Sequence, residues 1–177
     1  VIPDSFKDSI SSNEFCKIAK TALRKINHAC IIDCITIGDG GEGSLDSFKL
    51  IKDYNFRTML VKSPINELVK ATYCINKKTK TGIIELAQAS GIELVPVERR
   101  NPTKTTSYGT GQLIENIIAE GIKEVILFIG GSATNDVGIG MLDALGFSFK
   151  DSKNKILTAS VKNLSKIYKI EESPIYD

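Results

Sequence analysis

The chain has 177 residues, of which 25% are charged and 42% are hydrophobic, and its formal net charge is +2. This composition is ordinary for a globular protein of one or two domains that buries a sizeable core. The nearly balanced charge argues against a nucleic-acid partner, and the absence of any apolar run long enough to cross a bilayer argues against a membrane partner.

The cysteines Cys16, Cys30, Cys34 and Cys74 have neither CxxC spacing nor a histidine cluster beside them. This pattern indicates reduced core thiols of a cytoplasmic protein rather than a disulfide framework or a metal site. No segment at the start of the chain has the pattern of a secretion signal, which also favours the cytoplasm. His28 is the only histidine and follows an expected helix, so a histidine-based catalytic triad is disfavoured.

Strands and helices alternate over the first part of the chain. Val1-Ile2 has the pattern of the end of a strand, and residues 31–37 form a second apolar run rich in β-branched side chains. Between them, Ser11 and Glu14 have capping-box spacing and apolar residues recur at helical spacing, which predicts an amphipathic helix over residues 12–27. This order is typical of a parallel α/β sheet, so the loops after both strands are expected at the edge where ligands gather.

Residues 38–43 spell GxGxxG directly after the second expected strand. A nicotinamide or flavin dinucleotide is disfavoured there, because Asp39 and Glu42 would repel a pyrophosphate and no acidic residue follows at the spacing that a ribose requires. Carboxylates among glycines are better suited to Mg²⁺, which takes oxygen ligands and carries substrate phosphates. A helix is expected next, with one face formed by Leu45, Phe48 and Ile51.

From residue 55 the pattern changes to that of a mixed sheet. Its expected elements are strands over residues 56–62 and 71–75, a turn over residues 77–82 and an apolar run from Ile83. We place a domain boundary near Ser63-Pro64, which gives an N-terminal part over residues 1–63 and a second α/β part over residues 64–177.

A loop rich in hydroxyls, residues 101–111, leads into a helix with apolar side chains at Leu113, Ile114, Ile117 and Ile118. Backbone N–H groups at the start of a helix, together with hydroxyls, bind anions, so Thr106 and Ser107 are candidate phosphate ligands. An ordinary N-cap explains the same residues equally well, and both interpretations stay open.

The most informative segment is residues 128–140, which follows an expected buried strand over residues 124–127 and precedes a short helix ended by Gly146. It is not a Walker loop, because no Gly-Lys-Ser/Thr follows, and a plain glycine-rich turn is the alternative. Glycines let backbone N–H groups approach a ligand, and hydroxyls and amides can bond phosphate oxygens. The candidate groups are Gly130, Gly131, Ser132, Thr134, Asn135 and the carboxylate of Asp136. Residues 147–156 then predict a hairpin.

Five segments occur in a fixed order along the chain: residues 3–7, 39–43, 85–91, 101–111 and 130–136. In sequence and spacing they resemble the type 1 glycerate kinases. The resemblance implies phosphorylation of D-glycerate to 2- or 3-phosphoglycerate with ATP and Mg²⁺. It also implies two α/β domains, a Rossmann-like parallel-sheet domain with a mixed-sheet domain inserted in it. Because family members are about twice as long, both domains are expected to be incomplete in this chain.

Phosphoryl transfer depends on positioning and charge stabilisation, and a carboxylate can take the proton of the attacking hydroxyl. Asp136 and Asp39 are the candidates for base and metal ligand, Glu42 is a second metal ligand, and Lys7 would neutralise phosphate charge. Substrate and phosphate binding is expected from Asp4, Ser5, Gly40, Gly41, Thr106, Ser107, Gly130, Gly131, Ser132, Thr134 and Asn135.

Two positions depart from the family pattern. Asp8 stands where glycine commonly follows the Phe-Lys pair, and it puts negative charge beside Lys7; Val137 stands where glycine usually follows Asp136, and it removes backbone freedom. Two other functions stay open: a phosphate- or nucleotide-binding module without catalysis, and an inactive fragment of a kinase. The sequence does not determine the number of subunits, and a homo-oligomer is compatible with it.

Overall fold

The structure is a computed structural model that describes residues 1–3, 6 and 9–172. Its helices are α1 (Ser12–Ile26), α2 (Ala87–Ser90), α3 (Tyr108–Ala119) and α4 (Ile139–Ala144), with the 3₁₀-helices η1 (Ser44–Leu50), η2 (Ile92–Leu94), η3 (Val97–Arg99) and η4 (Val161–Lys166). Its strands are β1 (Tyr54–Lys62), β2 (Leu68–Asn76), β3 (Thr81–Glu85), β4 (Glu124–Phe128), β5 (Ser148–Lys150), β6 (Ile156–Leu157) and β7 (Lys169–Glu171). The expectations for Asp4, Ser5, Lys7 and Asp8 lie outside the described residues.

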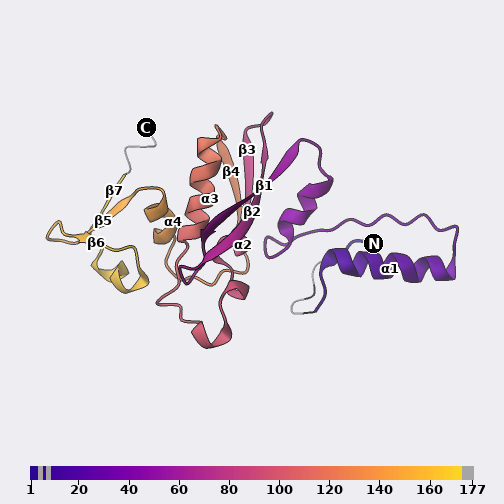
Figure 1. Ribbon diagram of the computed structural model, residues 1–177, viewed down its shortest axis with the longest axis horizontal. Coiled ribbons are helices and arrows are strands. Elements are labelled where there is room, and N and C mark those ends of the chain that lie inside the picture. The colour runs from indigo at the N-terminus through magenta and orange to yellow at the C-terminus, as the bar shows by residue number, and fades with distance from the viewer. Residues whose placement is uncertain (4–5, 7–8, 173–177) are drawn as a thin grey trace.

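A four-stranded mixed sheet in the order β1-β2-β3-β4 forms the centre of the molecule (Figure 1). β1 and β2 form an antiparallel hairpin, β3 adds antiparallel to β2, and β4 runs parallel to β3. The expected mixed sheet is therefore confirmed. The boundary expected near Ser63-Pro64 falls in the turn of the β1–β2 hairpin, and the division of the chain there stays a prediction.

Side chains of the sheet alternate between two packed faces, as the pleat of a strand requires. Ile84 packs with Leu113 and Ile117 of α3 on one face, whereas its neighbour Ile83 packs with Leu45 of η1 on the other. All five residues of β3 are buried, and the strand lies between β2 and β4.

β4 corresponds to the expected strand over residues 124–127, but it is not buried as the sequence analysis expected. Ile126 is 42% exposed, and Glu124 is exposed as well. Among the strands that the structure describes, only β3 pairs with β4, so β4 forms the edge of the sheet.

The helix expected after residue 43 is the 3₁₀-helix η1. Leu45 and Phe48 pack under the sheet, while Ile51 lies just beyond the helix and is 50% exposed. A spacing of three residues places side chains on one face of a 3₁₀-helix, which has three residues per turn.

α1 matches the helix expected over residues 12–27. The Ser11 hydroxyl accepts a hydrogen bond from the N–H of Glu14 at 3.2 Å, and the Glu14 carboxylate accepts one from the N–H of Ser11 at 3.3 Å. These two bonds complete the expected capping box.

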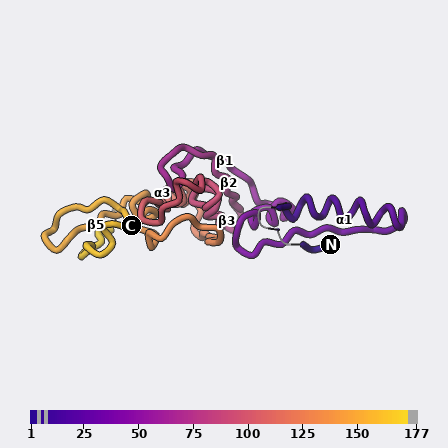
Figure 2. The backbone as a smooth tube through the Cα atoms, turned by 90° about the horizontal axis from the view of Figure 1, so that it is seen from below, coloured from indigo at the N-terminus to yellow at the C-terminus, as the bar shows by residue number. Residues whose placement is uncertain are grey.

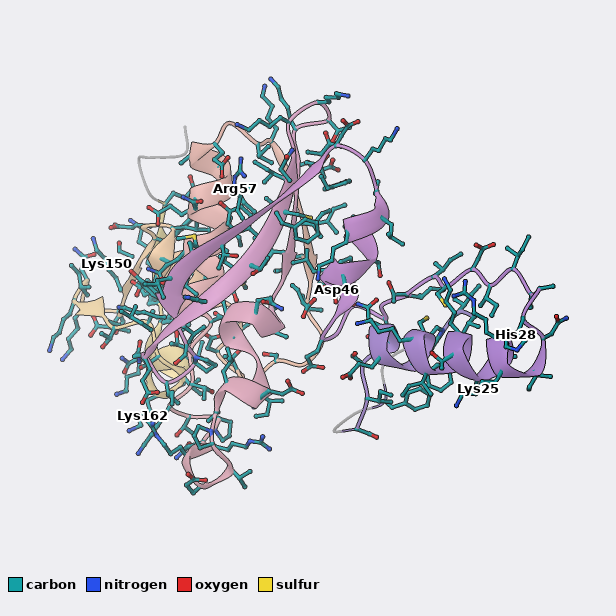
Figure 3. The ribbon with its side chains drawn as sticks, turned by 45° about the vertical axis from the view of Figure 1, so that its right-hand side comes forward. Lys25, His28, Asp46, Arg57, Lys150 and Lys162 are labelled. Carbon is teal, nitrogen blue, oxygen red and sulfur yellow. The ribbon has the colours of Figure 1, made fainter. Side chains whose placement is uncertain are left out.

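α1 and the segment that follows it form an arm, residues 9–37, which lies to one side of the sheet (Figures 1 and 2). Asn13 of the arm donates a hydrogen bond to Asp46 of η1 at 3.1 Å, and Figure 3 shows Asp46 on the side of the body that faces α1. His28 lies at the far end of the arm, and Ile26 of its helix is 84% exposed.

Residues 31–37 do not form the expected strand. The terminal ammonium of Val1 donates to the carbonyl of Asp33 at 2.8 Å, and the N–H of Ile35 donates to the carbonyl of Val1 at 3.0 Å. This is the bonding of one parallel residue pair. The prediction was wrong because a ladder needs several such pairs, and the described residues supply no other strand beside this segment; Ile31 is 91% exposed.

A second, three-stranded sheet has the order β6-β5-β7, and its β5–β6 pair confirms the expected hairpin. Phe149 of β5 is fully buried beneath it. The Glu171 carboxylate of β7 pairs with Lys150 at 2.6 Å and Lys169 at 2.9 Å. These two ammonium groups lower the pKa of Glu171 to about 2.

All four cysteines are free thiols. Cys16 and Cys74 are buried, and burial raises the pKa of the Cys74 thiol to about 12. Cys30 is exposed, so the expectation of a core thiol was wrong there, because it lies in the uncovered arm. Within the residues that the structure describes, no helix has the length and apolarity that a bilayer crossing requires.

Candidate active site

Two glycine-rich loops, far apart in the sequence, meet at the carboxyl end of β4. The N–H of Gly130 donates a hydrogen bond to the carbonyl of Gly40 at 2.7 Å. A Cβ atom at Gly130 would lie 2.5 Å from the Cα of Gly41, so the contact requires glycine at this position. The structure thus brings together residues 38–43, which carry carboxylates, and residues 130–136, which carry hydroxyls and amides.

The two carboxylates of the first loop have different surroundings. Asp39 is exposed, and its Oδ1 accepts the N–H of Gly41 at 2.8 Å, which closes a tight turn. Glu42 reaches across to the second loop, where its carboxylate occupies the space that a Cβ at Gly131 would fill. Gly131 has a φ of 69°, a conformation that side chains disfavour, so glycine is needed there for two reasons.

Glu85, at the end of β3, holds the first loop in place. Its buried carboxylate accepts the N–H groups of Gly43 and Leu45, each at 3.0 Å, and one from Gln88 at 3.4 Å. Glu85 begins residues 85–91, one of the five segments that resemble the family, but the sequence analysis assigned it no role. The one available signal was an acidic residue directly after an apolar strand.

The second loop is fixed against the end of α2 and the start of η2. The N–H of Ile92 donates to the carbonyl of Gly131 at 2.8 Å, and the N–H of Ala133 donates to the carbonyl of Ser90 at 2.9 Å. At the surface of the loop, the hydroxyls of Ser132 and Thr134 lie 3.0 Å apart and both residues are partly or fully exposed. Ser132, Thr134 and Asn135 are all at least partly exposed, so a ligand can reach them.

Asp136 is 2% exposed, and its carboxylate has four donors. Oδ2 accepts the N–H and the hydroxyl of Ser107, both at 2.8 Å, and the N–H of Gly140 at 3.2 Å. Oδ1 accepts the N–H of Gly138 at 3.1 Å. The carboxylate therefore joins the start of α4 to the residue before α3.

The hydroxyls at the start of α3 make hydrogen bonds within the protein. Thr106 accepts the N–H of Tyr108 at 3.2 Å, which is a local cap. Ser107 is 1% exposed, and its hydroxyl also accepts the N–H of Met141 at 3.1 Å. Thr106 remains partly exposed, whereas the Ser107 hydroxyl is used within the protein.

A cavity of about 200 Å³ opens beside the second loop. Ser132, Thr134 and Asn135 line one side of it, and Arg100 and Asn101 line another. Sequence reasoning missed Arg100, although it lies directly before the loop that begins at Asn101.

A sequence profile of the Glycerate kinase family matches residues 1–176. The chain belongs to the glycerate kinase family. Similar relatives are the glycerate kinase of Haemophilus influenzae, 40% identical over 97% of this chain and 45% of the relative, and the glycerate 2-kinase of Escherichia coli, 40% identical over 86% of this chain and 40% of the relative. A crystal structure described as a candidate glycerate kinase 2 from Salmonella typhimurium LT2 superposes with a TM-score of 0.77 at 34% identity, covering 96% of this chain and 46% of that one. The chain spans about half the length of the curated relatives it matches.

The carboxylates of the first loop are the oxygen ligands that a magnesium ion takes. Among the described residues, no three acidic, histidine or cysteine side chains gather as ligands. Mg²⁺ is commonly held by one or two carboxylates, with water and substrate phosphates completing its shell. Asp39 and Glu42, on one loop, fit that smaller donor set.

Proposed function

We propose that the protein is a kinase that phosphorylates D-glycerate with ATP. The observation that carries the proposal is the contact between Gly130 and Gly40, through which a loop of carboxylates and a loop of hydroxyls form one surface. The family membership supports it, and the likeness to the Escherichia coli glycerate 2-kinase favours 2-phosphoglycerate over 3-phosphoglycerate as the product. The proposal concerns the whole protein, since the chain spans about half the length of these relatives.

The carboxylates of the first loop are proposed to serve the metal. Asp39 and Glu42 would hold Mg²⁺, which when bound neutralises charge on the transferred phosphoryl group. Oδ2 of Asp39 has no hydrogen-bond partner among the described residues and is exposed, so it is available to a ligand. The hydrogen bonds from Gly43 and Leu45 to Glu85 hold this loop in place, so that its two carboxylates stay together despite their like charge.

The second loop is proposed to hold the substrate. The N–H groups around Gly130 and Gly131 and the side chains of Ser132, Thr134 and Asn135 supply donors to phosphate or carboxylate oxygens. Thr106 is a further donor, and Gly40 and Gly41 allow the close approach. Lys7, Asp4 and Ser5 keep their expected phosphate-binding roles as predictions.

Two carboxylates remain as candidates for the general base. The exposed Asp39 has a free oxygen, whereas Asp136 already accepts four hydrogen bonds inside the protein. We therefore propose Asp39 as base or metal ligand and Asp136 as the residue that positions the second loop. Asp136 stays the second candidate for the base, and its substitution decides between the two roles.

Coupled release of ADP by the full-length protein tests the function. We expect turnover that requires both D-glycerate and Mg²⁺, and a loss of about 10²–10⁴ in kcat for Asp39→Asn, the range typical of a general base. Asp33→Asn, an exposed carboxylate in the arm, is the matched control and should keep the activity of the wild type. Nucleotide binding without turnover would support a binding module instead. If the full-length protein turns over but residues 1–177 alone show neither binding nor turnover, this chain is an inactive fragment of a kinase.

The cellular location stays a prediction. The four free thiols support the reducing cytoplasm, because disulfides are rare there.

A further inference from the structure

Arg100 is an arginine without an acidic partner in the described part of the chain. Its Nε donates to the carbonyl of Val95 at 3.1 Å, and Nη2 lies 3.5 Å from the carbonyl of Ile92. These contacts use the Nε and Nη2 groups of the guanidinium. They leave the Nη1 group without a hydrogen bond among the described residues. The adjacent Arg99 is different, because it pairs with Glu67 at 2.6 Å.

The cavity that Arg100 lines has the positive charge that binding of an anion requires. Among the residues that the structure describes, no acidic side chain lines it, and Arg100 is its single charged group. Asn101 and Asn135 add amide donors, Ser132 and Thr134 add hydroxyls, and Ile92 and Val95 form an apolar wall. An unpaired guanidinium with polar neighbours binds carboxylate or phosphate through two parallel hydrogen bonds.

The volume of the cavity favours a small anion over a nucleotide. Pockets for ligands of drug size occupy about 300–1,000 Å³, whereas this cavity measures about 200 Å³. A small acid therefore matches the cavity better than a whole nucleotide does.

We infer that Arg100 is a specificity-determining residue that binds the carboxylate of a small hydroxy acid, with the hydroxyls of the second loop facing the hydroxyl end of that acid. The inference rests on the proposed function, to which it adds the group that recognises the acid. Arg100 contacts the substrate away from the reacting hydroxyl, so it binds ground state and transition state alike. Its loss should raise KM and leave kcat unchanged.

The test compares Arg100→Gln, Arg100→Lys and the neighbouring control Arg99→Gln in the full-length protein, with D-glycerate and its neutral amide as acceptors. We expect Arg100→Gln to raise the KM for D-glycerate about 10- to 100-fold, which corresponds to one hydrogen bond with a charged group. The KM for ATP and the KM for the amide should stay the same. Arg100→Lys should recover part of the loss because it keeps the charge but not the fork. Arg99→Gln should behave as the wild type.

Three results would overturn the inference: an unchanged KM for D-glycerate, an equal rise for the neutral amide, or a rise in the KM for ATP, which would make Arg100 a phosphate ligand. If the wild type does not phosphorylate D-glycerate, the proposed function fails by itself. Calorimetric binding of D-glycerate to the wild type and to Arg100→Gln then decides the inference, since equal or absent binding contradicts it. Matching circular dichroism melts show that the variants fold.

Discussion

Ser107 donates two hydrogen bonds to one oxygen of Asp136, one from its N–H and one from its hydroxyl, each at 2.8 Å. The two residues are 29 positions apart, and both are buried. Through this pair the residue that precedes α3 is fixed to the loop that precedes α4.

Substitution Asp136→Asn should destabilise the protein. An amide offers one acceptor oxygen, so its NH₂ group must face an N–H or O–H donor that the carboxylate now accepts. A buried unmatched donor costs about 1–3 kcal/mol, and each kcal/mol lowers Tm by about 2–4 °C in a protein of this size. Thermal melts and kcat are measured together, with Asp33→Asn as control. An unchanged Tm with kcat reduced about 10²–10⁴-fold would instead make Asp136 the general base.

Substitution Glu85→Gln should loosen the first glycine loop. The glutamine oxygen can accept only one of the two N–H groups of Gly43 and Leu45, because these bonds go to different carboxylate oxygens. Hydrogen exchange of these two amides should become faster, and the concentration of Mg²⁺ needed for half-maximal activity should rise. Glu115→Gln, at an exposed position of α3, is the matched control. Unchanged exchange at Gly43 and Leu45 would show that the loop does not depend on Glu85.

Substitution Val137→Gly should stabilise the protein slightly. Val137 has a φ of 56°, is 83% exposed and stands where the family pattern has glycine. Glycine adopts this left-handed conformation without the strain of a side chain, which raises the free energy of unfolding by about 1–2 kcal/mol. The greater freedom of glycine in the unfolded chain lowers it by about 0.4–1 kcal/mol. The expected net gain of about 0–1.6 kcal/mol is measured by urea unfolding. Val97→Gly, at a 72% exposed valine without a positive φ, should destabilise. If both variants lose stability equally, Val137 is not strained.

Acid should weaken the contact between β7 and β5. Lys150 and Lys169 lower the pKa of Glu171 from 4.5 to about 2, so the folded state binds this proton more weakly than the unfolded chain. The stabilising effect is complete above pH 4.5 and is lost as the pH falls through about 2. Melts of the wild type and of Glu171→Gln, taken across that range, should differ at neutral pH and converge on acidification. A constant difference would contradict this account.

Local signals predicted the elements whose bonds lie within one segment. The capping box of Ser11 and Glu14 involves residues three positions apart, so its geometry follows from spacing alone. The prediction of a strand over residues 31–37 was wrong for the opposite reason. A strand exists only where other strands pair with it, and the composition of a segment does not show whether they do. β4 was found, but its position at the edge depends on neighbours that its own sequence does not reveal.

The candidate site divides in the same way. The glycines of both loops were visible in the sequence, but their contact joins Gly40 to Gly130 across the fold. Glu85 and Arg100 act through neighbours that local patterns do not identify. Whether the expected site residues take part in the reaction stays a prediction until the variants above are measured.

The position of the arm has a consequence for biosynthesis. Among the described residues, no side chain from before Leu45 belongs to the two hydrophobic clusters of the sheet. Domains generally fold from the N-terminus while the ribosome is still adding residues. Here the sheet can collapse around its own core once β4 has emerged, whereas the arm, made earlier, still exposes Ile26 and Ile31. The arm is therefore synthesised before the sheet beside it, and its apolar side stays uncovered when that sheet closes its own core.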